Sequence, residues 1–249
     1  IPMCGVKYHS AKGYIEQLID QGYKVAICEQ MEDPKKTKGM VKREVVRIIT
    51  PGTLIDDFGM DDGRSNYILA LDEESGLFTA AYSDISTGEI FAFSTGDRDV
   101  LKSEIDRIRP REVVVESDIE DLMSELYSDP PVTTPFSNET HFPLEYGEGI
   151  TEGEQKTLDL LVGYIRAHNM KDLKHFRTVE KHRIKETMQL NYAALSNLEL
   201  LESLQTKKTK GSLFWYLNRT ETPMGKRKLR KWIERPLLRR KAIEERHEA

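Results

Sequence analysis

Three acidic residues, Asp84, Glu104 and Glu116, have types and spacing that could hold divalent metal ions. We expect Asp84 at a strand end, Glu104 on the following helix and Glu116 at the end of a buried strand. A two-metal nuclease holds its ions with acids placed in this way. In the other interpretation, Asp84 and Glu116 are turn residues and Glu104 is a solvated helix residue. We favour the second interpretation, because acids at strand ends are common and no second acid stands beside Asp84.

Nucleotide-binding motifs fail at specific positions. The pair Gly225-Lys226 lacks the P-loop pattern, because Thr220 stands where the first glycine is needed and Arg227 follows the lysine. The run at 147–149 lacks the last glycine of a dinucleotide fingerprint. Neither the histidines nor the two cysteines have a supporting catalytic or metal-ligand motif. We therefore expect no catalytic residue, metal or cofactor in this chain, and neither binding nor hydrolysis of ATP.

The basic residues gather at one end. From Gln205 onward the chain holds 14 Lys or Arg against five Glu, whereas the preceding residues hold 23 basic and 37 acidic side chains. Basic side chains surround Trp232 at Lys226, Arg227, Lys228, Arg230, Lys231 and Arg235. Such a surface can bind a phosphate backbone, and the alternative is an ordinary solvated helix face. We expect Trp232 itself to lie in the core.

The elements that position these residues follow from periodicity. In residues 1–52 we expect a helix that Ser10 caps and Gly22 ends, with strands at 25–28 and 45–49. The acidic, glycine-bearing residues 53–63 are a predicted linker.

Residues 64–130 have a mixed α/β rhythm. Three strands precede a helix, a buried strand and a second helix, at 67–71, 77–84, 89–93, 100–108, 113–115 and about 119–126. Three antiparallel strands, then helix, strand and helix, is the opening order of an RNase-H-like domain. Residues 129–152 are loop-rich, and the helical pattern resumes at Leu158 and again from Asn191, with Thr222 capping a late helix.

Composition bounds the location of the chain. There is no apolar stretch of 18 residues and no signal peptide, so we expect no membrane contact and a cytoplasmic protein with free thiols. The chain begins at Ile1 and stops at Ala249 in a charged helical run, and we expect both ends to be cuts within a longer protein.

Several motifs, in the right order, resemble the MutS family of DNA mismatch-repair proteins. The first half carries IPMCGVKYH at 1–9, VAICEQ at 25–30 and REVVRIITPGT at 43–53. The second half carries NLEL at 197–200, GSL at 211–213, TPMG at 222–225 and WIERPL at 232–237. The middle of the chain matches the family only in pattern.

The resemblance implies a layout of domains. Residues 1–52 would be the C-terminal part of the mismatch-binding domain, followed by the linker at 53–63. Residues 64–180 would be a connector domain, RNase-H-like and not catalytic, and residues 185–249 the start of the helical core, or lever, domain. The implied fold class is α/β, a mixed-sheet remnant plus the connector, followed by an all-α start of the core domain.

The resemblance also implies a function. The chain would relay between binding of mismatched double-stranded DNA and the ATPase-driven recruitment of MutL, with ATP, Mg and the homodimer belonging to the whole protein. Five residues would contact DNA, by resemblance and by charge: Met3, Tyr8, Lys38, Lys42 and Arg43. The family's Phe-x-Glu wedge is not in this sequence. An RNase-H-like, metal-dependent nuclease remains the alternative.

Overall fold

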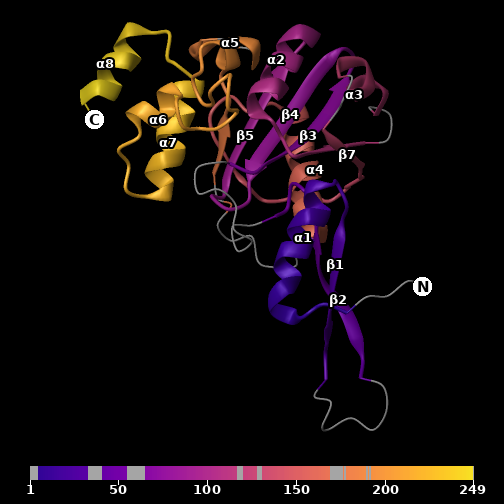
Figure 1. Ribbon diagram of the computed structural model, residues 1–249. Coiled ribbons are helices and arrows are strands. Elements are labelled where there is room, and N and C mark those ends of the chain that lie inside the picture. The colour runs from indigo at the N-terminus through magenta and orange to yellow at the C-terminus, as the bar shows by residue number, and fades with distance from the viewer. Residues whose placement is uncertain are drawn as a thin grey trace.

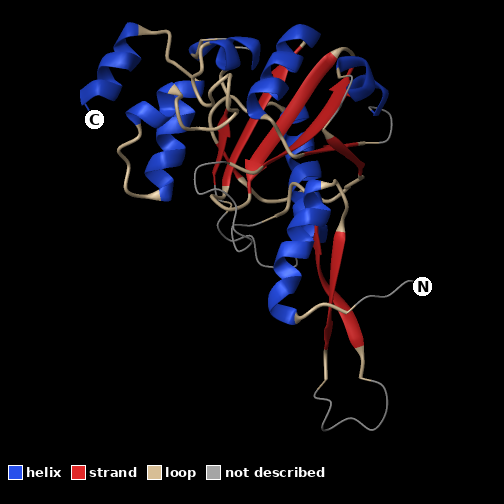
Figure 2. Cartoon of the chain, viewed as in Figure 1, coloured by secondary structure: helices blue, strands red, loops and turns tan. Residues whose placement is uncertain are grey.

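The computed structural model describes residues 5–32, 41–54, 65–116, 120–127, 131–168, 176, 178–188, 190 and 192–248. Figures 1 and 2 show three units in chain order. We call residues 5–54 the hairpin unit, residues 65–182 the sheet unit and residues 183–248 the helical unit. Most of the predicted linker, from residue 55 to residue 63, lies outside the described residues.

The hairpin unit consists of one helix packed on a two-stranded antiparallel ribbon. Its elements are η1 (Tyr8–Ser10), α1 (Ala11–Asp20), β1 (Val25–Gln30) and β2 (Arg43–Ile49). Ile19, Ile49 and Leu54 form its small core. Gly22, at φ 83°, ends the helix as predicted. Ser10 is the N-cap residue of α1, as predicted, but its side chain makes no cap hydrogen bond, because the chain enters through a 3₁₀ turn and Ser10 is itself in a helical conformation.

The sheet unit contains a seven-stranded mixed sheet. Its elements are β3 (Tyr67–Glu74), β4 (Leu77–Asp84), β5 (Glu89–Thr95), α2 (Arg98–Ile108), β6 (Glu112–Val115), α3 (Glu120–Leu126), β7 (Val132–Pro135), β8 (Glu145–Tyr146), α4 (Glu152–His168) and β9 (Thr178–Lys181). The strand order is β7-β6-β3-β4-β5-β9-β8. Strands β3, β4 and β5 are antiparallel, and the other neighbouring pairs are parallel.

The predicted order of three strands, helix, strand and helix is present. Helix α2 begins at Arg98 because the Asp97 carboxylate accepts hydrogen bonds from the N–H groups of Asp99 and Val100. It ends before Arg109, at φ 50°, and Pro110. The loop-rich prediction for 129–152 was wrong in part, since the short strands β7 and β8 lie there; such short edge strands carry a weak sequence signal.

Helices cover both faces of the sheet, so its strands are buried on both sides. The alternation of β3 places Ile68 and Ala70 against α4, and Leu69 and Leu71 against α2 and α3. This explains why β3 and β4 read as almost continuous apolar runs. No described helix is long and apolar enough to cross a membrane.

The helical unit follows β9. Its elements are η3 (Ile184–Glu186), α5 (Tyr192–Asn197), α6 (Leu213–Leu217), α7 (Pro223–Glu234) and α8 (Arg240–Glu248). Thr222 caps α7 through its side chain, with Pro223 in the first turn, as predicted. An isolated bridge pairs Thr187 with Leu237. In Figure 1, α6 and α7 lie beside the sheet unit, on the side of β5.

Candidate functional site

The residues predicted to contact DNA belong to the hairpin unit. Lys42 and Arg43 are exposed at the start of β2, and the Lys42 Nζ lies 2.5 Å from the Glu44 carboxylate. Tyr8 lies in η1, but its side chain is outside the described part of the chain, as are Met3 and Lys38. The ribbon of β1 and β2 extends away from the sheet unit in Figure 1.

A buried carboxylate joins the hairpin unit to the sheet unit. Glu112, at the start of β6, is fully buried. Its Oε2 accepts hydrogen bonds from the Thr50 hydroxyl at 2.5 Å and from the Gly52 N–H at 3.0 Å. Its Oε1 accepts from the Thr134 hydroxyl at 2.7 Å and from the Tyr164 hydroxyl at 2.6 Å. We call these contacts the Glu112 junction; they bind the turn after β2 to three elements of the sheet unit.

Asn66 holds the same turn from a second side. Its side-chain amide donates to the carbonyl oxygens of Pro51 at 3.2 Å and Leu54 at 2.9 Å. Its backbone N–H donates to Asp84 at 3.2 Å. Because a buried polar group must keep its partners, these contacts fix the turn as well as attaching it.

A second buried polar cluster joins the sheet unit to α7. Glu104 and Arg107 of α2 form an ion pair, and His182 Nε2 lies beside both, 3.0 Å from Arg107 and 3.3 Å from Glu104. His182 Nδ1 lies 3.2 Å from the Tyr82 hydroxyl, which accepts from Arg235 at 2.9 Å. We call these five residues the Tyr82–Arg235 network. It ties α2, β4, the residue after β9 and the end of α7 together.

The surroundings of His182 fix its charge. Its Nε2 lies 3.0 Å from the Arg107 guanidinium and 3.3 Å from the Glu104 carboxylate, and its Nδ1 faces the Tyr82 hydroxyl. Burial lowers the pKa of His182 well below its usual value, and the charges of Arg235 and Arg107 lower it further. The imidazole is therefore neutral at physiological pH and acts as a fixed polar link.

The three carboxylates considered for a nuclease are occupied by structural contacts. Asp84 is buried and accepts from the N–H groups of Asn66 and Ser86, as a turn residue does. Glu116 lies 3.9 Å from Lys156. The prediction that Glu104 is solvated was wrong, since it is fully buried beside Arg107. Within the described ranges, no three His, Cys, Asp or Glu residues form a group that could hold a metal ion.

Several basic residues of α7 face the sheet unit. Arg227 donates to Ser86 at 3.3 Å, and the Lys231 ammonium lies 3.4 Å from Glu89. Trp232 was predicted to lie in the core, but it is 37% exposed, and the Arg246 guanidinium lies 4.7 Å from its ring centroid. The prediction failed because α7 turns its cations, rather than this indole, toward the sheet.

Comparison with known proteins gives a consistent result. The family model for MutS domain I matches residues 1–58, and that for MutS domain III matches residues 193–249. The two matches flank the strands of the seven-stranded sheet.

Full-length relatives extend the similarity across the middle. The chain is 45% identical over 247 residues to the DNA mismatch repair protein MutS of Staphylococcus haemolyticus. The matched region covers 99% of this chain and 28% of that protein. It is 42% identical over 253 residues to the same-named protein of Staphylococcus carnosus, covering 100% of this chain and 29% of that protein. The chain thus spans less than a third of the length of these relatives. On the strength of the two domain matches and this identity along its whole length, the chain belongs to the MutS family of DNA mismatch-repair proteins.

Proposed function

We propose that this chain is the part of a mismatch-recognition protein that relays between DNA binding and the ATPase-driven recruitment of MutL. The observation that carries the proposal is the pair of buried polar clusters. The Glu112 junction ties the hairpin unit to the sheet unit, and the Tyr82–Arg235 network ties the sheet unit to α7. Because buried polar contacts are costly to break, a displacement of the hairpin unit is passed to α7 rather than absorbed.

The proposed domain limits follow the units. Residues 1–52 are the end of a mismatch-binding domain, 53–63 a linker, 64–180 an RNase-H-like connector without catalytic activity, and 185–249 the start of an all-α core domain. The antiparallel β3-β4-β5 strands, with β6 and β7 added in parallel beside β3, support the RNase-H-like assignment. ATP, Mg, the homodimer and a cytoplasmic location belong to the proposal for the whole protein.

Duplex DNA is the proposed ligand of the hairpin unit, through Met3, Tyr8, Lys38, Lys42 and Arg43. With three or four phosphate contacts, log K should fall with log salt at a slope of roughly −3. Fluorescence anisotropy on this 249-residue chain measures that slope. The double variant Lys42→Gln, Arg43→Gln should lower the magnitude of this slope by about 2, because each phosphate contact contributes about 0.9.

The control is Lys102→Gln, which removes an exposed charge from α2 and should leave the slope unchanged. If the double variant and the unchanged chain have the same salt slope, Lys42 and Arg43 do not contact DNA. Lacking the Phe-x-Glu wedge, the chain should bind a G·T mismatch and a homoduplex equally. A tenfold preference for the mismatch would contradict this expectation.

MutL is the proposed partner of the sheet unit. We expect micromolar binding to the MutL N-terminal domain, about −8 kcal/mol. Surface plasmon resonance of the chain before and after Asp121→Lys, an exposed charge on α3, tests whether that face takes part. Absence of binding at high micromolar concentration, with circular dichroism showing a folded chain, removes MutL from the proposal.

A further inference from the structure

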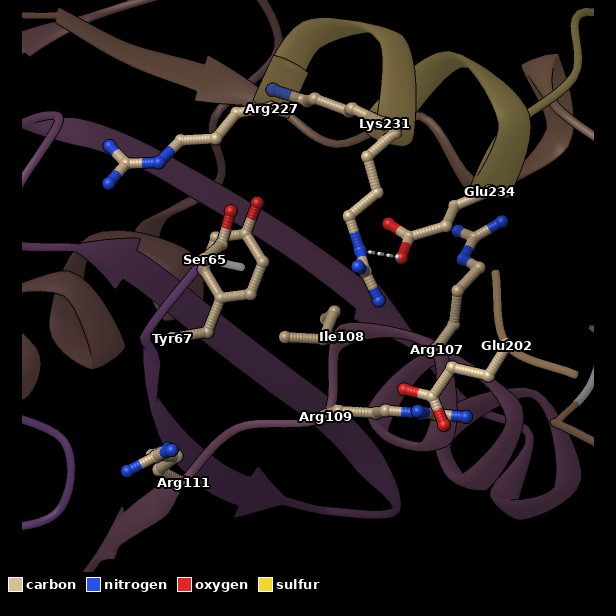
Figure 3. A pocket seen from close by; sticks show the side chains of 11 residues that line it. Ser65, Tyr67, Arg107, Ile108, Arg109, Arg111, Glu202, Arg227, Lys231 and Glu234 are labelled. Atoms are coloured by element: carbon tan, nitrogen blue, oxygen red, sulfur yellow. Dashed lines mark hydrogen bonds and ion pairs between the residues drawn. The ribbon is translucent and has the colours of Figure 1, made fainter. Parts of the chain in front are cut away.

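A cavity of about 280 Å³ lies between the sheet unit and α7. Six cationic side chains line it: Arg107, Arg109, Arg111, Arg227, Arg230 and Lys231. In Figure 3, residues of α7 lie along one side and Arg109 and Arg111 along the other, with Tyr67 and Ile108 between them. The cavity is therefore formed only where α7 is docked on the sheet unit.

The lining is positively charged. Two carboxylates, Glu202 and Glu234, stand against the six cations. Arg230 pairs with Glu234 at 3.1 Å, and Arg111 pairs with Asp20 at 3.2 Å. Lys231 pairs with Glu89, which is outside the lining, at 3.4 Å. The net charge around the cavity stays positive when the carboxylates of Asp20, Glu89 and Glu104 are added to those of the lining.

The existing ion pairs leave capacity for a ligand. Each guanidinium has five N–H donors, and the ion pairs of Arg111 and Arg230 each occupy one guanidinium nitrogen. The partners Asp20 and Glu89 are 66% and 48% exposed, so water screens these two contacts and an anion can compete with them. Arg107 is buried at the cavity wall, and its Nε has no hydrogen-bond partner. A buried N–H without an acceptor costs free energy, and an anion that accepts a hydrogen bond from it removes that cost.

The size and chemistry of the cavity select the ligand class. Its volume is just below the roughly 300–1,000 Å³ of most small-molecule sites, and its lining is largely charged. Arginine forks match the oxygens of phosphate in pairs. We propose that this cavity binds a small multivalent phosphate anion, of the pyrophosphate or phosphomonoester class, which holds α7 against the sheet unit. The site uses side chains rather than a glycine-rich backbone loop, so nothing in it prepares a nucleotide for hydrolysis.

Pyrophosphate is the probe, measured by isothermal titration calorimetry at constant ionic strength with chloride as the balancing ion. We expect millimolar or tighter binding, and a rise of about 5 °C in Tm at saturating pyrophosphate, since a ligand that binds only the folded state stabilises it. If 10 mM pyrophosphate gives no heat of binding and no shift in Tm, the proposal is overturned.

Two lysines of the same helix supply the variant and its control. Lys231→Gln removes a cation from the lining, whereas Lys228→Gln makes the same change at an exposed position outside it. We expect Lys231→Gln to raise the Kd about tenfold, and Lys228→Gln to leave it within twofold. Equal effects of the two variants, with both chains folded by circular dichroism, would show only a general attraction by α7 and would overturn the site.

A competition experiment separates the two sources of phosphate. A blunt DNA duplex should not displace pyrophosphate, because the rod of a duplex cannot enter a cavity of this volume. Displacement by the duplex at equal phosphate concentration would assign these cations to a DNA surface and would refute the small-anion proposal. The result is independent of MutL binding and of the DNA contacts proposed for the hairpin unit.

Discussion

Replacing Glu112 with glutamine should loosen the joint between the hairpin and sheet units. The carboxylate accepts four hydrogen bonds in a fully buried position. Gly52 donates a backbone N–H, so the amide oxygen of the variant must stay on that side. The new NH₂ group then faces Thr134 and Tyr164, whose hydroxyls must turn to accept. All four contacts lose the strength that a charged acceptor gives.

The expected cost follows from these contacts. A hydrogen bond to a charged group contributes about 1.5–3 kcal/mol and a neutral one about 0.5–1.5 kcal/mol. Neutralising the side chain also removes the cost of burying a charge, which offsets part of the loss. We therefore expect Glu112→Gln to lower the free energy of unfolding by about 2 kcal/mol, which for a chain of this size is a fall in Tm of roughly 4–8 °C.

Thermal unfolding followed by circular dichroism measures this loss. Limited proteolysis should show faster cleavage near residues 50–54, because the turn is held by Glu112 and Asn66. Glu139→Gln makes the same chemical change at an exposed position and should shift Tm by less than about 1 °C. If Glu112→Gln and Glu139→Gln have the same Tm, the Glu112 junction does not hold the two units together.

Three further changes test the same joints. Gly52→Ala places a Cβ 2.9 Å from a side chain of β3 and should cost about 1–3 kcal/mol in urea unfolding, unlike Gly5→Ala, whose Cβ meets nothing within 4 Å. Tyr82→Phe removes the hydroxyl that accepts from Arg235 and contacts His182, and should cost about 1–3 kcal/mol, whereas Tyr216→Phe, at 67% exposed, should cost little. Because the folded-state pKa of His182 is lowered, its contribution to stability is present above about pH 6.5 and is lost as pH falls, by at most about 1.4 kcal/mol per pH unit. His182→Asn should flatten that part of the pH profile of unfolding, and an unchanged profile would refute the role of His182.

The local elements were predictable because their signals are local. Apolar periodicity located β3, β4, β5 and α2 to within a few residues, and Thr222 with Pro223 marked the start of α7. The family was recognisable from motifs at both ends of the chain, since matches of that kind need no knowledge of contacts.

The joints between the units were not predictable in this way. Glu112 precedes an apolar strand and resembles any acid at a strand end, and Glu104 fits the pattern of a solvated helix residue. The partners that make them structural, Thr50 at 62 residues' separation and His182 on a distant element, are brought to them only by the folded sheet.

The sequence by itself determined most of the longer helices and strands and the family that the chain resembles, because those properties depend on the order and periodicity of neighbouring residues. Only the tertiary structure decided that Glu112 holds the turn after β2 and that His182 is a neutral link to Tyr82. It also decided that the cations of α7 face Arg109 and Arg111 across a cavity. The physical reason is that the cost of burying a charged or polar group depends on the partners that surround it, and these come from parts of the chain far apart in sequence.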